Sequence, residues 1–167
     1  MGTALGALLS GVLALSGCGY KLAGGNTFLP ERIKSILVTP FENRTSRPEI
    51  DQRVTEAVAR ELSKRGGYKV VSERADADAI LGGAVTEYRL NPVQFDEEGR
   101  ATRMEAIVTL QAALRDRADE SVLWSQTGLV FREQYDVLSE VREEQIALDD
   151  IALGAAGALV TSMFEGF

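Results

Sequence analysis

The sequence predicts an α+β fold, a two-layer α/β sandwich in which one mixed sheet of four to five strands carries two helices on one face. The first half of the chain has the order strand, helix, short strand, which implies a right-handed crossover between parallel strands. Three longer segments of alternating apolar and polar residues follow, as in half-buried antiparallel strands. A second helical pattern comes last, and both helices must then cover the same side of the sheet.

The opening unit consists of two short strands and the helix between them. Lys34 to Phe41 is a β-branched run closed by Pro40, and Tyr68 to Ser72 is a second short apolar run. Between them, apolar residues recur at helical spacing from Ile50 to Leu62. The two strands should therefore be parallel neighbours in one sheet.

Both ends of this helix have local signals. Ser46 and Glu49 stand three residues apart and predict a capping box, with Pro48 in the first turn. Gly66-Gly67 should end the helix in a left-handed conformation. The helix is thus expected to begin just after Ser46.

The three longer strands are predicted at Ile80 to Leu90, Met104 to Arg115 and Val122 to Arg132, separated by charged turns. Gly128 interrupts the alternation of the last one and suggests a β-bulge. One face is expected to be apolar, from Ile80, Ala84, Tyr88, Leu90, Met104, Ala106, Val108, Leu110, Ala112 and Leu114. The other should be polar and mixed in sign, from Glu87, Arg89, Glu105, Thr109, Gln111 and Arg115.

The second helix is predicted from Ser139 to Phe164. Its small residues between Gly154 and Ala158 should let it lie close against the sheet. The uncharged run Ile151 to Phe164 is shorter than the roughly 20 residues needed to span a membrane. The sequence therefore favours a core helix.

The start of the chain has the pattern of a bacterial lipoprotein signal. Leu15-Ser16-Gly17-Cys18 reads as a lipobox, the residues from Ala4 to Leu15 are small or apolar, and every charged residue lies after Cys18. No Lys or Arg precedes the apolar run, which departs from the usual signal pattern. Cys18 would carry two or three acyl chains, enough for a persistent membrane anchor. An aspartate directly after the cysteine would favour retention of the lipoprotein in the inner membrane. Gly19 at this position favours anchoring in the outer membrane, on its periplasmic side.

These features divide the chain into three parts. Residues 1–17 are expected to be a removed signal peptide, 18–28 the acylated cysteine with a short tether, and 29–167 a single domain. Cleavage after residue 17 of 167 leaves 150, enough for one sizeable core.

Composition narrows the function. The net charge of −7 argues against non-specific nucleic-acid binding. Histidine is absent and the single cysteine is the one predicted to be acylated, so Ser-His-Asp and Cys-His catalysis are excluded. No metal site, cofactor or enzymatic activity is expected.

Arginines are the most informative charges after the anchor, because guanidinium forks can bind phosphates. They lie at the predicted turns and on the polar sheet face. A solvated, ion-paired surface is the competing interpretation for most of them. The candidates for binding a phosphorylated ligand are Arg89, Arg103, Arg115, Arg100 and Arg117, and Arg44 and Arg47 belong to the same set of charges.

The order and spacing of several short motifs resemble the LPS-assembly lipoproteins (LptE). They are Gly17-Cys18-Gly19-Tyr20, Leu29-Pro30, Val38-Thr39-Pro40-Phe41-Glu42-Asn43-Arg44-Thr45, Val54-Thr55-Glu56-Ala57, Arg65-Gly66-Gly67-Tyr68, Ala77-Asp78-Ala79-Ile80-Leu81-Gly82-Gly83, Tyr88-Arg89-Leu90, Gly99-Arg100-Ala101, Leu114-Arg115-Asp116-Arg117 and Leu123-Trp124. The resemblance implies a non-catalytic outer-membrane lipoprotein that plugs the LptD β-barrel and assists the passage of lipopolysaccharide into the outer leaflet. Its partners would be the LptD barrel, lipopolysaccharide and the membrane.

A second family resemblance keeps an alternative open. Outer-membrane lipoproteins that activate a cell-wall synthase, and curli-secretion lipoproteins, share the strand, PFEN, helix, Gly, strand opening found from Ile36 to Val71. Such activators usually have a long linker after the acylated cysteine. Only about ten residues separate Cys18 from the domain here. Such a tether reaches roughly 35 Å, which favours a domain held at the membrane.

Overall fold

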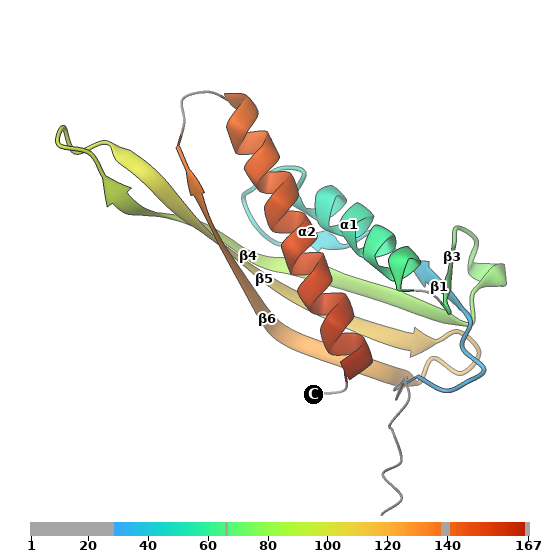
Figure 1. The fold of residues 1–167 in the computed structure, drawn as a ribbon. Helices are drawn as coiled ribbons and strands as arrows, with labels where there is room; N and C mark the ends of the chain where they lie inside the picture. Colours follow the sequence, from blue (N-terminus) through green and yellow to red (C-terminus); the bar gives the residue numbers. More distant parts are fainter. Residues whose placement is uncertain (1–28, 66, 138–140, 166–167) are drawn as a thin grey trace, which may run out of the picture.

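A computed structural model describes residues 29–65, 67–137 and 141–165, with side chains from Gln145 onward in the last stretch. Its elements form one mixed, open sheet and two helices (Figure 1). The elements are β1 (Ser35–Val38), β2 (Glu42–Asn43), α1 (Ile50–Lys64), β3 (Lys69–Val71), a short 3-10 turn η1 (Arg74–Asp76), β4 (Ala79–Phe95), β5 (Ala101–Asp116), β6 (Val122–Asp136) and α2 (Val141–Glu165).

The sheet has the order β3-β1-β4-β5-β6, and β2 also pairs with β4. β1 pairs in parallel with β3, as the crossover predicts, and β1 and β2 run parallel to β4. β4, β5 and β6 are antiparallel. The α+β class is confirmed, but the sheet has six strands instead of four or five. The predicted first strand ends at Val38, before Pro40, which has no N–H for a ladder. The additional strand is β2, which forms after Phe41 in a segment that the sequence indicates as a polar turn.

Both helices pack on one face of the sheet and against each other (Figure 1). The core lies between these two layers, where Val54, Val58 and Leu62 of α1 meet the sheet with no exposed surface. Ile151, Ala155 and Leu159 form the corresponding stripe of α2. The helical spacing predicted for α1 is therefore confirmed, and α2 is a core helix as expected.

The predicted capping box at the start of α1 is wrong. Glu49 is the N-cap residue, it has a left-handed backbone with φ 64°, and its side chain makes no capping hydrogen bond. Asn43 instead organises the preceding turn: its Oδ1 accepts from the N–H of Thr45 at 3.0 Å, and its Nδ2 donates to the carbonyl of Arg47 at 2.7 Å. The turn is stabilised by a side chain from β2, so the helix begins three residues later than Ser46 would place it.

A β-bulge in β4 changes which side chains face the helices. The pairing with β5 shifts between Val85 and Glu87. Ala79 and Leu81 are buried before the bulge, while Tyr88 packs against the core after it. The expectation that Ile80 shares a face with Tyr88 is therefore wrong: Ile80 pairs with Arg115, and both lie on the face opposite the helices.

The alternation predicted for β5 and β6 is confirmed. Ala106, Val108, Leu110 and Leu114 are buried toward the helices. In β6 the pairing shifts between the partners of Leu110 and Ala112, and Gly128 has φ 72°, so the predicted bulge is present. The strands are longer than predicted, and the β4–β5 hairpin extends past α1 into a projecting tip (Figure 1).

Small residues bring α2 close to the sheet, as expected. Ala152, Ala155 and Ala156 are buried. By length and composition alone, the segment Gln145–Glu165 could cross a membrane, with a mean hydropathy of 1.5. In this fold one side of the segment, with Leu148, Ile151, Leu159 and Met163, is instead part of the protein core. Cys18 and the predicted tether lie outside the described residues.

Candidate functional site

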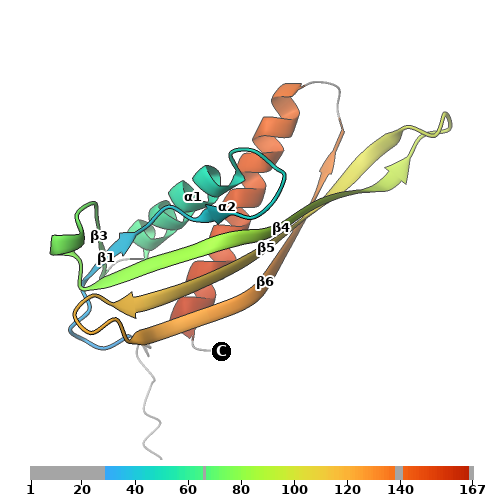
Figure 2. The same cartoon turned by 180° about the vertical axis from the view of Figure 1, so that it is seen from behind.

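Figure 2 shows the sheet face that is turned away from the helices, formed by β4, β5 and β6. Strands β4, β5 and β6 each direct alternate side chains to it, in register across the three strands. The polar ones are Glu87, Arg89, Arg103, Glu105, Thr109, Gln111, Arg115, Ser125, Arg132, Gln134 and Asp136, and the large apolar ones are Ile80, Ile107 and Val130. We call this surface the open face.

Toward the hairpin tip, several charges of the open face form ion pairs with one another. Arg89 binds Glu87 at 2.8 Å and Arg103 binds Asp136 across the β5–β6 pair at 2.7 Å. The Arg103 guanidinium holds the pKa of the Asp136 carboxyl below its usual range, and the pKa of Arg103 is raised in turn. Thr109 also donates to Glu87 at 3.2 Å. This half of the surface is a solvated network of nearly balanced charge.

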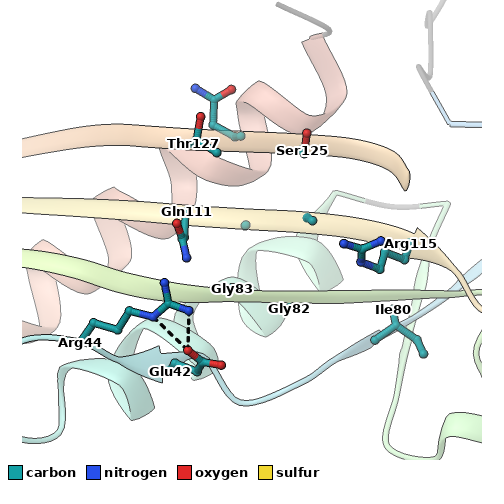
Figure 3. A pocket seen from close by; sticks show the side chains of 12 residues that line it. Glu42, Arg44, Ile80, Gly82, Gly83, Gln111, Arg115, Ser125 and Thr127 are labelled. Atoms are coloured by element: carbon teal, nitrogen blue, oxygen red, sulfur yellow. Dashed lines mark hydrogen bonds and ion pairs between the residues drawn. The ribbon is translucent and has the colours of Figure 1, made fainter. Parts of the chain in front are cut away.

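The other half of the open face, near the end where β4 begins, is hollowed. The hollow measures about 370 Å³ and lies over β4, β5 and β6 beside β2 (Figure 3). Small residues such as Gly82, Ala113 and Ser125 form part of its lining. Gln111 and Thr127 add an amide and a hydroxyl. The result is a shallow basin with an apolar floor and polar groups around it.

Two guanidinium groups flank this basin (Figure 3). Arg44 follows β2 and binds Glu42 through Nε at 3.0 Å and Nη2 at 2.7 Å. Arg115, near the end of β5, donates from Nη1 to the carbonyl of Glu120 at 3.4 Å, a long contact. Among the described residues, Arg115 has no carboxylate partner within ion-pair distance. It is therefore the basin's cation most available to an anionic ligand.

The glycine pair beneath the basin is required by close approach. A Cβ on Gly82 would lie 2.8 Å from the Thr39 hydroxyl, and one on Gly83 would lie 2.6 Å from Cε1 of Phe41. The neighbours are side chains of the segment that joins β1 to β2, which crosses beside β4, and, for Gly83, also the backbone of Gln111 and Ala112 in β5.

The five predicted arginines do not form one cluster. Arg115 borders the basin, whereas Arg89 and Arg103 lie on the same face toward the hairpin tip. Positions 103 and 115 are twelve residues apart on β5, which corresponds to about 40 Å. Arg100 binds Asp96 and Glu98 within the hairpin turn at 2.8 and 3.1 Å. Arg117 donates to the carbonyl of Ala77 at 2.6 Å and so fixes a turn.

Arg44 borders the basin but was not among the five arginines predicted to bind a phosphorylated ligand. Its place there depends on the parallel pairing of β2 with β4, in which Glu42 lies opposite Ala84 and Asn43 opposite Val85. A two-residue strand has no alternation of its own. The sequence indicates only a polar turn after Phe41. A turn does not specify on which face of the sheet the Arg44 side chain lies.

Comparison with protein families matches the chain to the lipopolysaccharide-assembly family LptE, whose model aligns with residues 33–163. A comparison with curated proteins gives no match.

Several solved structures share the fold at low sequence identity. PelC from Paraburkholderia phytofirmans, solved as a dodecamer, is 20% identical, with 84% of this chain and 94% of that chain covered and a TM-score of 0.55. For an uncharacterised lipoprotein B from Nitrosomonas europaea the identity is 19%, the coverage 88% and 96%, and the TM-score 0.53. XCC0632 from Xanthomonas campestris is 15% identical, with 81% of this chain and 86% of that chain covered and a TM-score of 0.52.

Proposed function

The chain belongs to the LptE family of lipopolysaccharide-assembly proteins, and from this membership we propose that it is a non-catalytic outer-membrane lipoprotein that plugs the LptD β-barrel. Within the barrel it assists the transfer of lipopolysaccharide into the outer leaflet. The family match over residues 33–163 is the observation that carries the proposal. Acylation at Cys18 would hold the body at the periplasmic side of the outer membrane.

The open face supports the role of a plug. The lumen of a large outer-membrane barrel is polar and filled with water, so a protein inside it needs a polar surface. Here one sheet face has mainly polar side chains of both signs, while the helices cover the apolar face. Its charges are nearly balanced, so the face would tolerate a lumen lined by residues of either sign.

The basin supports contact with the transported lipid. Lipopolysaccharide has phosphate groups beside apolar chains, and the basin joins guanidinium groups to an apolar floor. Arg115 is the residue we assign to a phosphate, with Arg44 as a second cation once Glu42 releases it. Arg89, Arg103, Arg100 and Arg117 would act mainly in the ion pairs and turn contacts that hold them.

Isolation of the tagged, acylated protein from solubilised envelopes tests the proposal. We expect a large outer-membrane barrel in a one-to-one ratio, identified by mass spectrometry. The synthase-activator alternative has the same opening strand and helix, and an inner-membrane cell-wall synthase in place of the barrel would establish it and refute the plug.

A further inference from the structure

The two edges of the sheet differ in how they are protected. One edge is β3, only three residues long and beginning with Lys69. The other is β6, fifteen residues long, with no proline or lysine and one bulge at Gly128. Natural proteins usually shorten, charge or cover an edge strand, because its free N–H and C=O groups can pair with another chain. Among the described strands, β6 pairs only with β5, so its other edge is unpaired.

The hydrogen-bond pattern shows which backbone groups of β6 are free. The Val137 N–H donates to the carbonyl of Thr102 at 2.8 Å, so the backbone groups of this pair face each other. Facing pairs alternate along antiparallel strands, and the register is regular from Asp136 back to Leu129. The N–H and C=O groups that therefore point away from β5 belong to Val130, Arg132, Gln134 and Asp136. None of them has a hydrogen-bond partner among the described residues.

Only another extended strand matches this arrangement, in which donors and acceptors repeat at every second residue along one line. The side chains of β6 indicate which residue types an added strand would have. Arg132 on the open face and Glu133 on the helix side have no ion pair with a described residue. An added strand would complement them with an acidic residue next to a basic one, and Val130, 43% exposed, favours a β-branched residue opposite it.

A second copy of this chain is the poorer occupant. Symmetric antiparallel pairing places Arg132 opposite an acidic residue only when it is centred on Gln134, where Arg132 meets the partner's Asp136. That aspartate already binds Arg103. Centring on Arg132 or on Glu133 would set two like charges opposite each other, which is destabilising.

We propose that the outer edge of β6 from Val130 to Asp136 receives an extended segment of the barrel protein by backbone strand pairing. This inference rests on the proposed function, since it identifies which part of the plug binds the barrel chain. It adds a directional, backbone-mediated contact to the general polar fit of the open face.

Hydrogen–deuterium exchange provides the first test. The acylated protein is compared alone and in complex with its co-purified barrel, at single-residue resolution. We expect the amides of Val130, Arg132 and Gln134 to exchange about tenfold or more slowly in the complex. The amides of Phe131 and Glu133, already bonded to β5, should change little. Docking through side chains alone would not produce this alternation.

A proline substitution provides the second test. Gln134→Pro removes one outward N–H without breaking the β5–β6 ladder, and Gln134→Ala is the matched control that keeps it. We expect the proline variant to retain about a tenth of the co-purified barrel and the alanine variant nearly all of it. Fluorescence of Trp124, which is buried in the core, verifies that both variants are folded.

The outcomes are distinct. A barrel that co-purifies equally with both variants, without protection of the edge amides, overturns strand pairing while the plug function stands. Absence of any barrel with the unmodified chain refutes the proposed function and the strand pairing with it. Edge protection in the isolated protein that grows with concentration identifies a second copy as the occupant and overturns the barrel assignment.

Discussion

Gly154 of α2 lies directly over the ring of Phe131 of β6. A Cβ built on Gly154 would come within 2.8 Å of both Cε atoms of that ring, so any side chain must displace the ring or lift the helix. Phe131 is half-buried against the core. The contact fixes how close α2 can approach the edge strand.

Gly154→Ala should therefore destabilise the protein by about 1–3 kcal/mol, the usual range for overpacking. Gly157→Ala is the matched control, because a Cβ there meets nothing within 4 Å. Removing a glycine from a helix interior should stabilise that variant by about 0.5–1 kcal/mol. Thermal unfolding measured by Trp124 fluorescence distinguishes the two. Equal effects of the same sign would contradict the close helix–sheet contact.

Asp78 joins the start of β4 to the start of β1. Its Oδ2 accepts from the N–H groups of Lys34 and Ser35 and from the Ser35 hydroxyl, each at 2.9 Å. Asp78→Ala should cost about 1–3 kcal/mol of unfolding free energy, because these donors lose a charged acceptor. Asp76→Ala, a change in the same turn, should cost little. A comparable loss in both variants would mean that the turn, and not this carboxylate, provides the stability.

The same carboxylate predicts an acid-dependent loss of stability. The N–H of Lys34, followed by the Ser35 groups, lowers the pKa of Asp78 below its ordinary value. A carboxyl group whose pKa is lower in the folded state contributes stability that is complete above about pH 5 and is lost as pH falls through the lowered pKa. Melting temperature measured from about pH 6 to about pH 2 should fall less steeply for Asp78→Ala than for the unmodified chain. Parallel curves would exclude Asp78 as a source of the acid dependence.

Arg115 should contribute more to ligand binding than any other of the five predicted arginines. We expect Arg115→Gln to weaken lipopolysaccharide binding by about tenfold, the loss of one charge-assisted contact. Arg100→Gln is the control, since Arg100 is held by two carboxylates in the hairpin turn. Binding is measured by titration of the purified proteins, with thermal unfolding alongside. If Arg100→Gln weakens binding as much as Arg115→Gln does, the basin is not the phosphate site.

Cys18→Ala tests the anchor. The variant should leave the membrane fraction and accumulate as a soluble periplasmic protein, because no acyl chains can be attached. Fractionation followed by mass spectrometry of the N-terminal peptide is the measurement. Membrane retention of the variant at the level of the unmodified chain would show that something other than acylation holds it there.

Local periodicity determined much of the fold in advance. The alternation in β5 and the helical spacing in α1 each specify a buried face without reference to the rest of the chain. Gly128 marked its bulge because few other residues adopt a positive φ. Local periodicity did not predict on which face of the sheet the Ile80 side chain lies. One extra residue after Val85 reverses the alternation, and a bulge without glycine leaves no local signal.

The sequence by itself therefore determined the fold class, the helices, the main strands and the polar character of the open face, since each depends on the spacing of neighbouring residues. The tertiary structure alone decided that β2 brings Arg44 beside the basin, that Arg115 lies about 40 Å from Arg103, and that β6 is left at the edge. These relationships depend on which distant segments pair and in what register. Their free energy comes from contacts between parts of the chain that no local pattern connects.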